Sequence, residues 1–190
     1  MKKSVALFVT LALTALLFHF ATVFAAPYVV MSAAMKRLSR DDTALNTWIH
    51  APRVSERSRA VVRPSPDLAY SACVYDLKDG PVRVRVAAWD DYMSVSMFQS
   101  NTDNFFTIND RRATAGVDLV LVEKGGEHPD AAGVVVESPS RRGIVIQRRL
   151  APTQQRFDAA AAIRASDTCE RLDDTSTSNG AASQERESRA

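Results

Sequence analysis

The chain has 190 residues, of which 46% are hydrophobic and 24% are charged, and its formal net charge is +2. These values are ordinary for a globular protein and exclude a collagen, a coiled-coil array and a wholly disordered chain. The charge gives no electrostatic support for a nucleic-acid partner, and two cysteines with three histidines offer little from which to build a zinc cluster. We therefore expect no metal and no cofactor.

The N-terminal segment begins with Lys2 and Lys3 and continues with an apolar stretch from Ser4 to Ala26. This stretch contains no Asp, Glu, Lys or Arg. As a helix it would be about 34 Å long, which is enough to cross the hydrocarbon core of a bilayer. We predict a transmembrane anchor over residues 1–26, with a cleaved signal peptide as the alternative. By the positive-inside rule Lys2 and Lys3 nearly balance Lys36, Arg37 and Arg40 on the other flank, but the tight basic cluster at the N-terminus beside a long apolar stretch favours export of the C-terminal part.

The part of the chain after the anchor is electrically neutral overall. The first 26 residues hold two of the 24 basic residues and none of the 22 acidic ones. Both cysteines, Cys73 and Cys169, lie in this exported part. An even number of cysteines in an oxidising compartment permits a disulfide, and two unpaired thiols are the alternative.

Residues 27–62 are expected to link the anchor to the folded domain. Apolar residues separated by charges between Ala33 and Trp48 predict either a short amphipathic helix in this linker or a helix that continues out of the membrane. His50 also lies in the linker. Pro64 and Pro66 would end any helix, so the folded domain is expected to begin at residue 63.

From residue 63 the hydrophobic pattern alternates, as is typical of β-strands. The clearest strand is Val82–Val86, in which valines alternate with arginines directly after a Gly-Pro turn signal. Further strands are expected at Tyr92–Gln99, Phe105–Ile108, Val117–Glu123, Val134–Val136 and Ile144–Ile146. No long helical pattern separates these strands, which favours an antiparallel sheet or sandwich over a doubly wound α/β fold.

The end of the chain is expected to contain one soluble helix and a disordered tail. Pro152–Leu172 includes an alanine run of high helix propensity. Residues 173–190 are polar and lack large apolar side chains, which is typical of disorder. The predicted fold class is therefore mainly β: an antiparallel β-sandwich-like domain over residues 63–172 with a C-terminal helix, preceded by one N-terminal transmembrane helix.

No specific catalytic motif is present, because the sequence has no G-x-S-x-G elbow, P-loop, H-E-x-x-H or C-x-x-C. Polar residues that interrupt the apolar strands are the remaining candidates. They would form either a hydrogen-bonded network or the lining of a polar ligand pocket. The candidate ligand-binding residues are Asp67, Tyr70, Tyr92, Asn104, Arg111 and Arg148.

Arg148 carries the most specific expectation of this set. It alternates with Ile144 and Ile146, so we expect it on the core-facing side of its strand. A buried guanidinium needs an acidic partner, and Asp67 and Asp76 are the expected ones.

The same residues carry a family resemblance over about Arg63 to Arg164. The chain resembles the bacterial domain-of-unknown-function family 1254 in a series of ordered motifs. These are Pro66-Asp67-Leu68-Ala69-Tyr70-Ser71, Tyr75-Asp76-Leu77, Gly80-Pro81-Val82, Asp91-Tyr92-Met93-Ser94-Val95, Asn104-Phe105 with Arg111-Arg112, and Ser138-Pro139 with Arg148. The resemblance implies a β-sandwich-like domain with no established activity.

The resemblance also bears on localisation and partners. Longer members of the family continue into a second β-rich domain, of unknown-function family 1214, and short members are membrane proteins that lack it. We therefore expect a single-pass protein of the bacterial inner membrane with a periplasmic domain, whose partners are the membrane and a separately encoded family 1214-like protein. A binding or assembly module of the cell envelope is the favoured function. An envelope enzyme, either a hydrolase or a carbohydrate-active protein that uses the polar residues, is the alternative.

Overall fold

The computed structural model describes residues 2–56, 58, 63–129 and 133–172, and these form nine strands in two sheets. In spatial order the larger sheet, sheet A, consists of β1 (Trp48–His50), β2 (Leu68–Asp76), β8 (Arg142–Leu150), β4 (Met93–Gln99) and β5 (Asn104–Asn109). The smaller sheet, sheet B, consists of β7 (Val134–Ser138), β6 (Val117–Glu123), β3 (Val82–Val86) and β9 (Thr168–Arg171). Neighbouring strands are antiparallel except β6 and β7, which are parallel. The mainly β, sandwich-like fold class predicted from the sequence is confirmed.

The main core lies between the two sheets. The valines of β3 alternate with arginines, so Val82, Val84 and Val86 are buried while Arg83 and Arg85 point away from the core. Met93, Val95 and Met97 of β4 face them from sheet A. A disulfide between Cys73 of β2 and Cys169 of β9, whose Cα atoms are 6.6 Å apart, joins the two sheets across this core.

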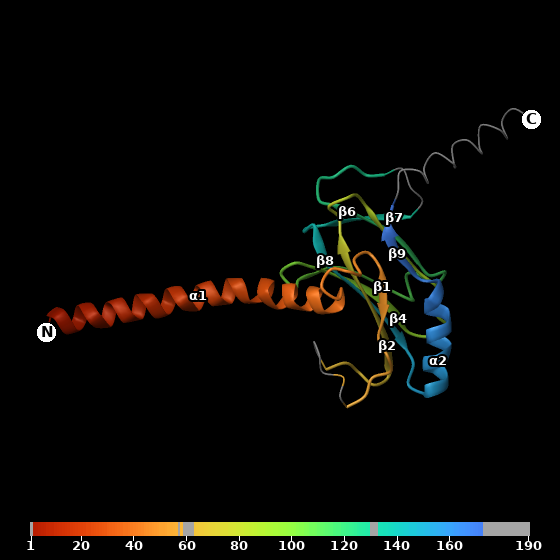
Figure 1. Cartoon of the computed structure of the whole chain (residues 1–190), viewed down its shortest axis with the longest axis horizontal. Helices are drawn as coiled ribbons and strands as arrows, with labels where there is room; N and C mark the ends of the chain where they lie inside the picture. Colours follow the sequence, from red (N-terminus) through yellow and green to blue (C-terminus); the bar gives the residue numbers. More distant parts are fainter. Residues whose placement is uncertain (1, 57, 59–62, 130–132, 173–190) are drawn as a thin grey trace, which may run out of the picture.

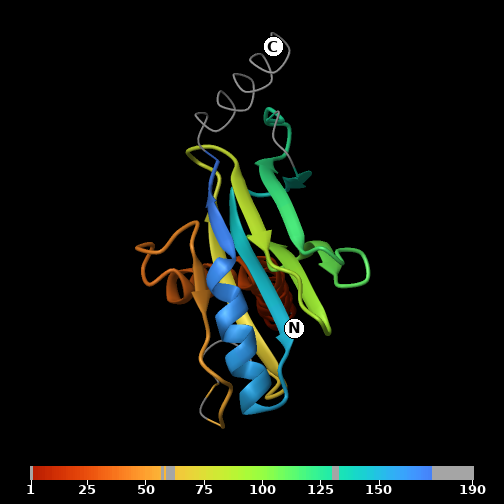
Figure 2. The same ribbon diagram turned by 90° about the vertical axis from the view of Figure 1, so that its right-hand side faces the viewer.

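Helix α2 (Gln154–Ile163) lies on the side of the molecule opposite the long N-terminal helix (Figures 1 and 2). The hydroxyl of Thr153 accepts a hydrogen bond from the Arg156 N–H and so caps the helix. Phe157 and Ala160 bury the inner side of α2 in the main core. The helix expected over Pro152–Leu172 is wrong beyond residue 163, because a short 3-10 turn, η1 (Arg164–Ser166), follows and the next residues form β9.

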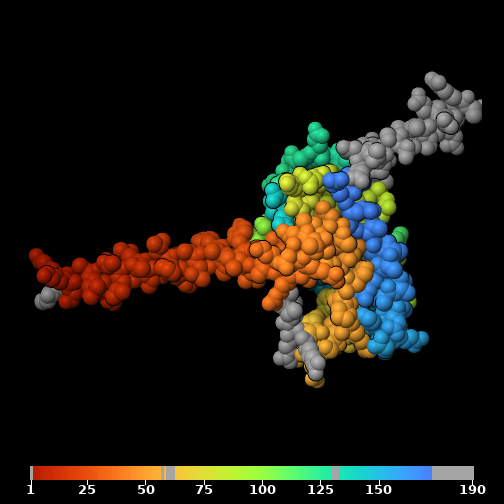
Figure 3. Space-filling model, viewed as in Figure 1, coloured from red at the N-terminus to blue at the C-terminus, as the bar shows by residue number. Residues whose placement is uncertain are grey.

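The N-terminal helix, α1 (Lys2–Leu38), projects far from the sheets (Figures 1 and 3). Its apolar side chains are uncovered over most of its length; Phe8 and Phe18, for example, are 73% and 72% exposed. Within the described part of the chain, α1 is the one helix long and apolar enough to cross a membrane, and its place near the N-terminus is also that of a signal sequence.

Residues 27–62 are not simply a linker, so the expected domain boundary at residue 63 is wrong. Helix α1 continues to Leu38, and β1 pairs with β2 in sheet A, with Trp48 opposite Cys73. The reason is burial: Trp48 is only 8% exposed once β1 lies beside the disulfide. The tail expected over residues 173–190 lies outside the described residues.

Candidate functional site

Sheet A has an outer face, which points away from sheet B and is divided into two parts. In the first part, Met31 and Met35 at the end of α1 pack on Val74 of β2 and Ile144 of β8. Side chains alternate along a strand. The residues two and four positions before Val74 in β2, and two and four positions after Ile144 in β8, therefore lie on the same face. There the surface becomes polar, beginning with Tyr70 and Arg148, which are directly opposite each other.

Four of the six candidate residues meet in this polar part, which we call the outer-face polar group. Its members come from β2, β8, β4 and β5 and from the residue before β4: Tyr70, Tyr92, Ser94, Ser96, Asn104, Thr107 and Arg148. The group therefore crosses sheet A beside the base of α1. The alternation that predicted these positions as interruptions of apolar strands also places them on one face.

Most members of the outer-face polar group bond to one another, whereas the Tyr70 hydroxyl accepts a hydrogen bond from the Ser65 N–H at 2.9 Å. Arg148 Nη1 donates to Ser96 Oγ at 3.2 Å, and the Tyr92 hydroxyl donates to Ser94 Oγ at 3.0 Å. Thr107 Oγ1 lies 3.0 Å from Asn104 Oδ1, to which it donates. Ser94 and Ser96 are buried under the longer side chains around them. These bonds form a surface network, and none of the group's members lines the two cavities described below.

The other two candidates lie elsewhere. Asp67 is exposed in the turn before β2, where its carbonyl accepts a hydrogen bond from the Ala151 N–H at 2.8 Å. Arg111 is exposed in the turn after β5. Neither is brought into the outer-face polar group.

The expectation that Arg148 faces the core and pairs with an aspartate is wrong. Arg148 is half-buried on the outer face and bonds to Ser96, whereas Asp76 forms ion pairs with Arg141 and Arg142, each at 3.4 Å. The buried arginine of β8 is the next residue, Arg149. Because both faces of β8 are covered where Ile144, Val145 and Ile146 lie, the apolar pattern alone does not show which set of alternate residues faces sheet B.

Arg149 forms the central polar interaction of the interior with Asp167, which follows η1. The side chains are 1% and 0% exposed, and Arg149 Nη1 and Nη2 donate to the two carboxylate oxygens at 2.8 and 3.0 Å. Gln147 Nε2 and the Ala87 N–H also donate to Asp167. Both carboxylate oxygens and both terminal nitrogens of the guanidinium are bonded, as a buried ion pair requires, whereas Arg149 Nε is buried without a hydrogen-bond partner. Sequence reasoning missed it because Asp167 was placed inside a helix.

A cleft of about 290 Å³ opens between β1 and β9, the neighbouring edges of the two sheets. It is lined by Asn46, Thr47, Trp48, His50, Asp167, Thr168, Cys169 and Glu170. Among the described residues, Trp48 Nε1 and Thr168 Oγ1 are buried without a hydrogen-bond partner.

His50 lies in this cleft with Nδ1 2.8 Å from Ser71 Oγ. Burial lowers the pKa of His50, and the positive charge of Arg164 lowers this pKa further, so the ring is neutral near pH 7. Ser71 is only 2% exposed, which prevents a substrate from reaching its hydroxyl. The serine and histidine therefore form a structural contact within sheet A and not a nucleophilic site.

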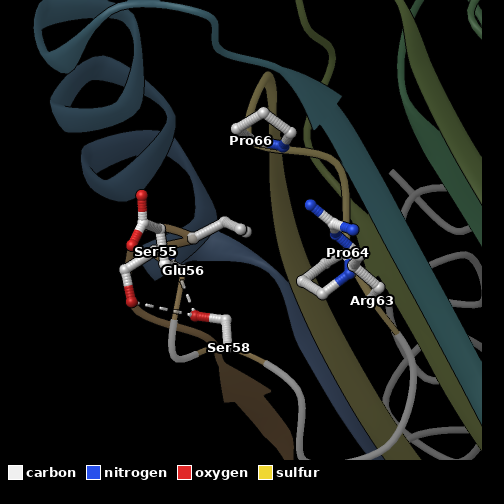
Figure 4. A pocket seen from close by; sticks show the side chains of 7 residues that line it. Ser55, Glu56, Ser58, Arg63, Pro64 and Pro66 are labelled. Carbon is white, nitrogen blue, oxygen red and sulfur yellow. Dashed lines mark hydrogen bonds between the residues drawn. The ribbon is translucent and has the colours of Figure 1, made fainter.

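A second cavity, of about 560 Å³, lies in the loop between β1 and β2 (Figure 4). All of its described lining residues belong to this loop: Val54, Ser55, Glu56, Ser58, Arg63, Pro64 and Pro66. Ser55 and Ser58 bond to each other across the turn, as Figure 4 shows. None of the candidate residues lines this cavity, and the loop contacts the outer-face polar group through the Ser65 N–H, which donates to the Tyr70 hydroxyl at 2.9 Å.

The connection between α1 and sheet A is held by polar contacts as well as by methionines. After Leu38 the chain reverses through Arg40, Asp41 and Asp42, whose φ angles of 52°, 56° and 65° are left-handed. Asp42 accepts a 2.6 Å hydrogen bond from Arg142 Nη2 and a 3.0 Å bond from the Ser39 hydroxyl. The Arg142 bond is the main reason that the pKa of Asp42 lies below its usual value. The end of α1 is thus fixed to β8 rather than joined to it by a loose segment.

Known proteins similar to this chain add the family and the fold. The family model described as "Protein of unknown function (DUF1254)" matches residues 45–171. The VPA0106 protein from Vibrio parahaemolyticus is a similar solved structure, with 14% identity and a TM-score of 0.62, and the match covers 78% of this chain and 36% of that one. An uncharacterised protein from Burkholderia cenocepacia has 12% identity and a TM-score of 0.45, covering 63% of this chain and 35% of that one.

No curated protein matches the chain. The chain spans about a third of the length of the two solved structures. At this identity the Vibrio protein shows a shared fold alone. The family match covers β1 through β9, which is the whole sandwich described above. This chain therefore belongs to the family of proteins of unknown function DUF1254.

Proposed function

We propose that the protein is a membrane-anchored module of the bacterial cell envelope, whose β domain binds or assembles with other envelope components. One observation carries the proposal: α1 is uncovered along its apolar part but buried at its end, where Met31 and Met35 are 5% and 9% exposed. A helix that is apolar all round needs an apolar solvent, because large uncovered apolar surfaces are unfavourable in water. A bilayer provides that solvent, and the buried end fixes the β domain beside it.

Charge and the disulfide support an orientation of the chain in which the β domain is exported. Lys2 and Lys3 precede the apolar part of α1, which favours a cytoplasmic N-terminus. The bond between Cys73 and Cys169 is of a kind that persists in oxidising compartments such as the periplasm. Both features support an inner-membrane protein with a periplasmic β domain. A cleaved signal peptide that ends near Ala26 is the alternative.

Binding rather than catalysis is proposed because the outer-face polar group is engaged in its own hydrogen bonds. Arg148, Thr107 and Tyr92 each donate to another member of the group. A catalytic site instead needs groups that converge on an open space where a substrate can react.

The proposed partner is a separately encoded protein that resembles the family 1214 domain. Support comes from the Vibrio structure, of which the match covers 36%, so most of that chain lies outside the domain shared with this one. Purification of the tagged full chain from detergent-solubilised membranes tests this partner. A family 1214-like protein should be recovered with it reproducibly, and recovery of the chain alone would contradict the assignment.

A fusion experiment tests the anchor and its orientation. A reporter that is active only after export, fused after Arg171, should be active and should remain in the membrane fraction at full length. A cytoplasmic reporter active at the same position would overturn the orientation. A fusion shortened by about 26 residues would show that the segment is a signal peptide instead.

A further inference from the structure

Strand β5 is the edge strand of sheet A on the side opposite β1. Within the described residues it pairs with β4 alone. It has six residues, whereas the other edge strands, β1, β9 and β7, have three, four and five. It is therefore the longest edge that the described part of the chain leaves open.

The sequence of β5 lacks charges and proline, which are two of the usual protections of an edge strand. An open edge presents unpaired N–H and C=O groups, and proteins normally block it with charges, proline or a bulge. The edge strand β9 carries Glu170 and Arg171, and β7 carries Glu137. By contrast β5 reads Asn-Phe-Phe-Thr-Ile-Asn, with no charged residue and no proline. Its one irregularity is a register shift opposite Met97 and Phe98, which leaves Phe106–Asn109 in regular pairing.

The apolar side chains of β5 are incompletely covered. Phe105, Phe106 and Ile108 pack against the main core but remain only partly buried. A further strand beside β5 would cover them and extend the core. Such a surface of neutral, aromatic and β-branched residues is typical of an edge that pairs with another strand.

The geometry of the anchor favours a second copy of this chain as the partner of the β5 edge. Antiparallel pairing of two copies of one edge creates a two-fold axis perpendicular to the sheet, and this axis leaves both copies with the same face on the same side. Helix α1 leaves the outer face of sheet A in Figure 1. Figure 2 views α1 along its axis, and the strands there run roughly from top to bottom of the picture, so α1 is steeply inclined to the sheet. The two anchors of such a pair would therefore be nearly parallel and would enter the same membrane.

We propose that two copies of this chain pair antiparallel through β5, so that sheet A continues from one copy into the other. The contribution of the anchor rests on the proposed function, whereas the open, uncharged edge does not depend on it. The absence of charge on β5 means that no like charges oppose each other across the two-fold axis.

Cysteine crosslinking tests the pairing in the full-length chain in native membranes. Because the two natural cysteines form a disulfide, Thr107→Cys on the exposed side of β5 introduces a unique thiol. Mild oxidation should give a species of twice the chain's mass, and Phe106→Cys provides the neighbouring position near the middle of the strand. Glu170→Cys on β9 is the matched edge control and should stay monomeric.

The register provides a stricter test of the same proposal. In an antiparallel pair, chains carrying Asn104→Cys should crosslink to chains carrying Asn109→Cys more efficiently than either crosslinks to itself. Equal, background crosslinking at every β5 position and at Glu170→Cys would overturn the proposal. Crosslinking from β5 to a protein of different mass would show that the edge has another occupant and would also overturn it.

Fractionation of the same samples separates this proposal from the proposed function. A chain that is in the membrane but never crosslinks through β5 would contradict the pairing and leave the anchor intact. A chain that is recovered in the soluble fraction and crosslinks through β5 would contradict the anchor and support the pairing.

Discussion

Two adjacent arginines of β8 lie on opposite faces of sheet A and have different surroundings. On the inner face Arg149 is 1% exposed and has a bidentate aspartate, a glutamine and a carbonyl around it. On the outer face Arg148 is half-buried and bonds to a serine hydroxyl. The inner face therefore contains interactions that the fold cannot lose, whereas the outer face contains a surface network beside the attachment of α1.

This difference separates stability from function within one sheet. A buried charge is costly unless it is paired and hydrogen-bonded, so the residues around Asp167 are constrained by folding. Residues of the outer-face polar group can change with smaller effects on folding. Their position beside the base of α1 would bring them close to the bilayer under the proposed function.

The largest effect is expected from Arg149→Met, which leaves the Asp167 carboxylate buried without its main partner. We expect the free energy of unfolding to fall by about 3–5 kcal/mol, as for other broken buried pairs. Urea denaturation of residues 27–172 or of the detergent-solubilised chain measures the change. Because Arg149→Met with Asp167→Leu removes both charges, the double variant should regain part of the loss.

Arg148→Met is the matched control on the other face, and we expect it to cost less than about 1 kcal/mol. If the two single variants lose equal stability, the distinction between the two faces is wrong. A larger loss for Arg148→Met would instead mean that the outer-face polar group holds the sheet together.

The disulfide is the next largest contribution to the inner side. Cys73 and Cys169 are 96 residues apart, and disulfides typically stabilise a fold by about 2–4 kcal/mol, with about 4.7 kcal/mol expected from unfolded-state entropy alone for a loop of about 100 residues. Replacing both cysteines with serine should lower the denaturation midpoint by a corresponding amount, with the folded circular dichroism spectrum retained. An unchanged midpoint would show that the link between β2 and β9 adds nothing to the packing around it.

A smaller effect is expected from the protonation of His50. Its pKa is lowered by folding, so the unfolded chain binds more protons below the ordinary value of 6.5. The contribution of His50 to stability is therefore fully present above pH 6.5 and is lost as the pH falls from there through the folded-state pKa. Melting temperatures of wild type and His50→Asn should converge as the pH is lowered from 7.5 to 5. A difference that stays constant over this range would contradict the assignment.

Much of the sandwich was predictable from local patterns. The alternation of valine and arginine predicted β3 with its exact ends, and the glycines around Val117–Glu123 delimited β6. The apolar N-terminal segment predicted the start of α1. The outcome for β9 was different, because Thr168–Arg171 is a strand only through its pairing with β3 and the disulfide, which are contacts distant in sequence.

The candidate site was predictable in part for a related reason. The sequence identified Tyr70, Tyr92, Asn104 and Arg148 as polar interruptions, and sheet A brings them to one face. It did not predict which face, because Ile144–Ile146 is apolar on both sides of β8. The apolar side chains on the outer side pack under the end of α1, and the sequence pattern of β8 does not contain that contact.

The central claim is that the outer face of sheet A, beside the base of α1, faces the membrane while sheet B lies further away. Fluorophores on Asn104→Cys of β5 and on Arg85→Cys of β3 mark the two sides in the full chain reconstituted in vesicles. Quenchers attached to lipid headgroups should reduce the emission from position 104 much more than that from position 85. Equal quenching at both positions, or stronger quenching at position 85, would contradict the account.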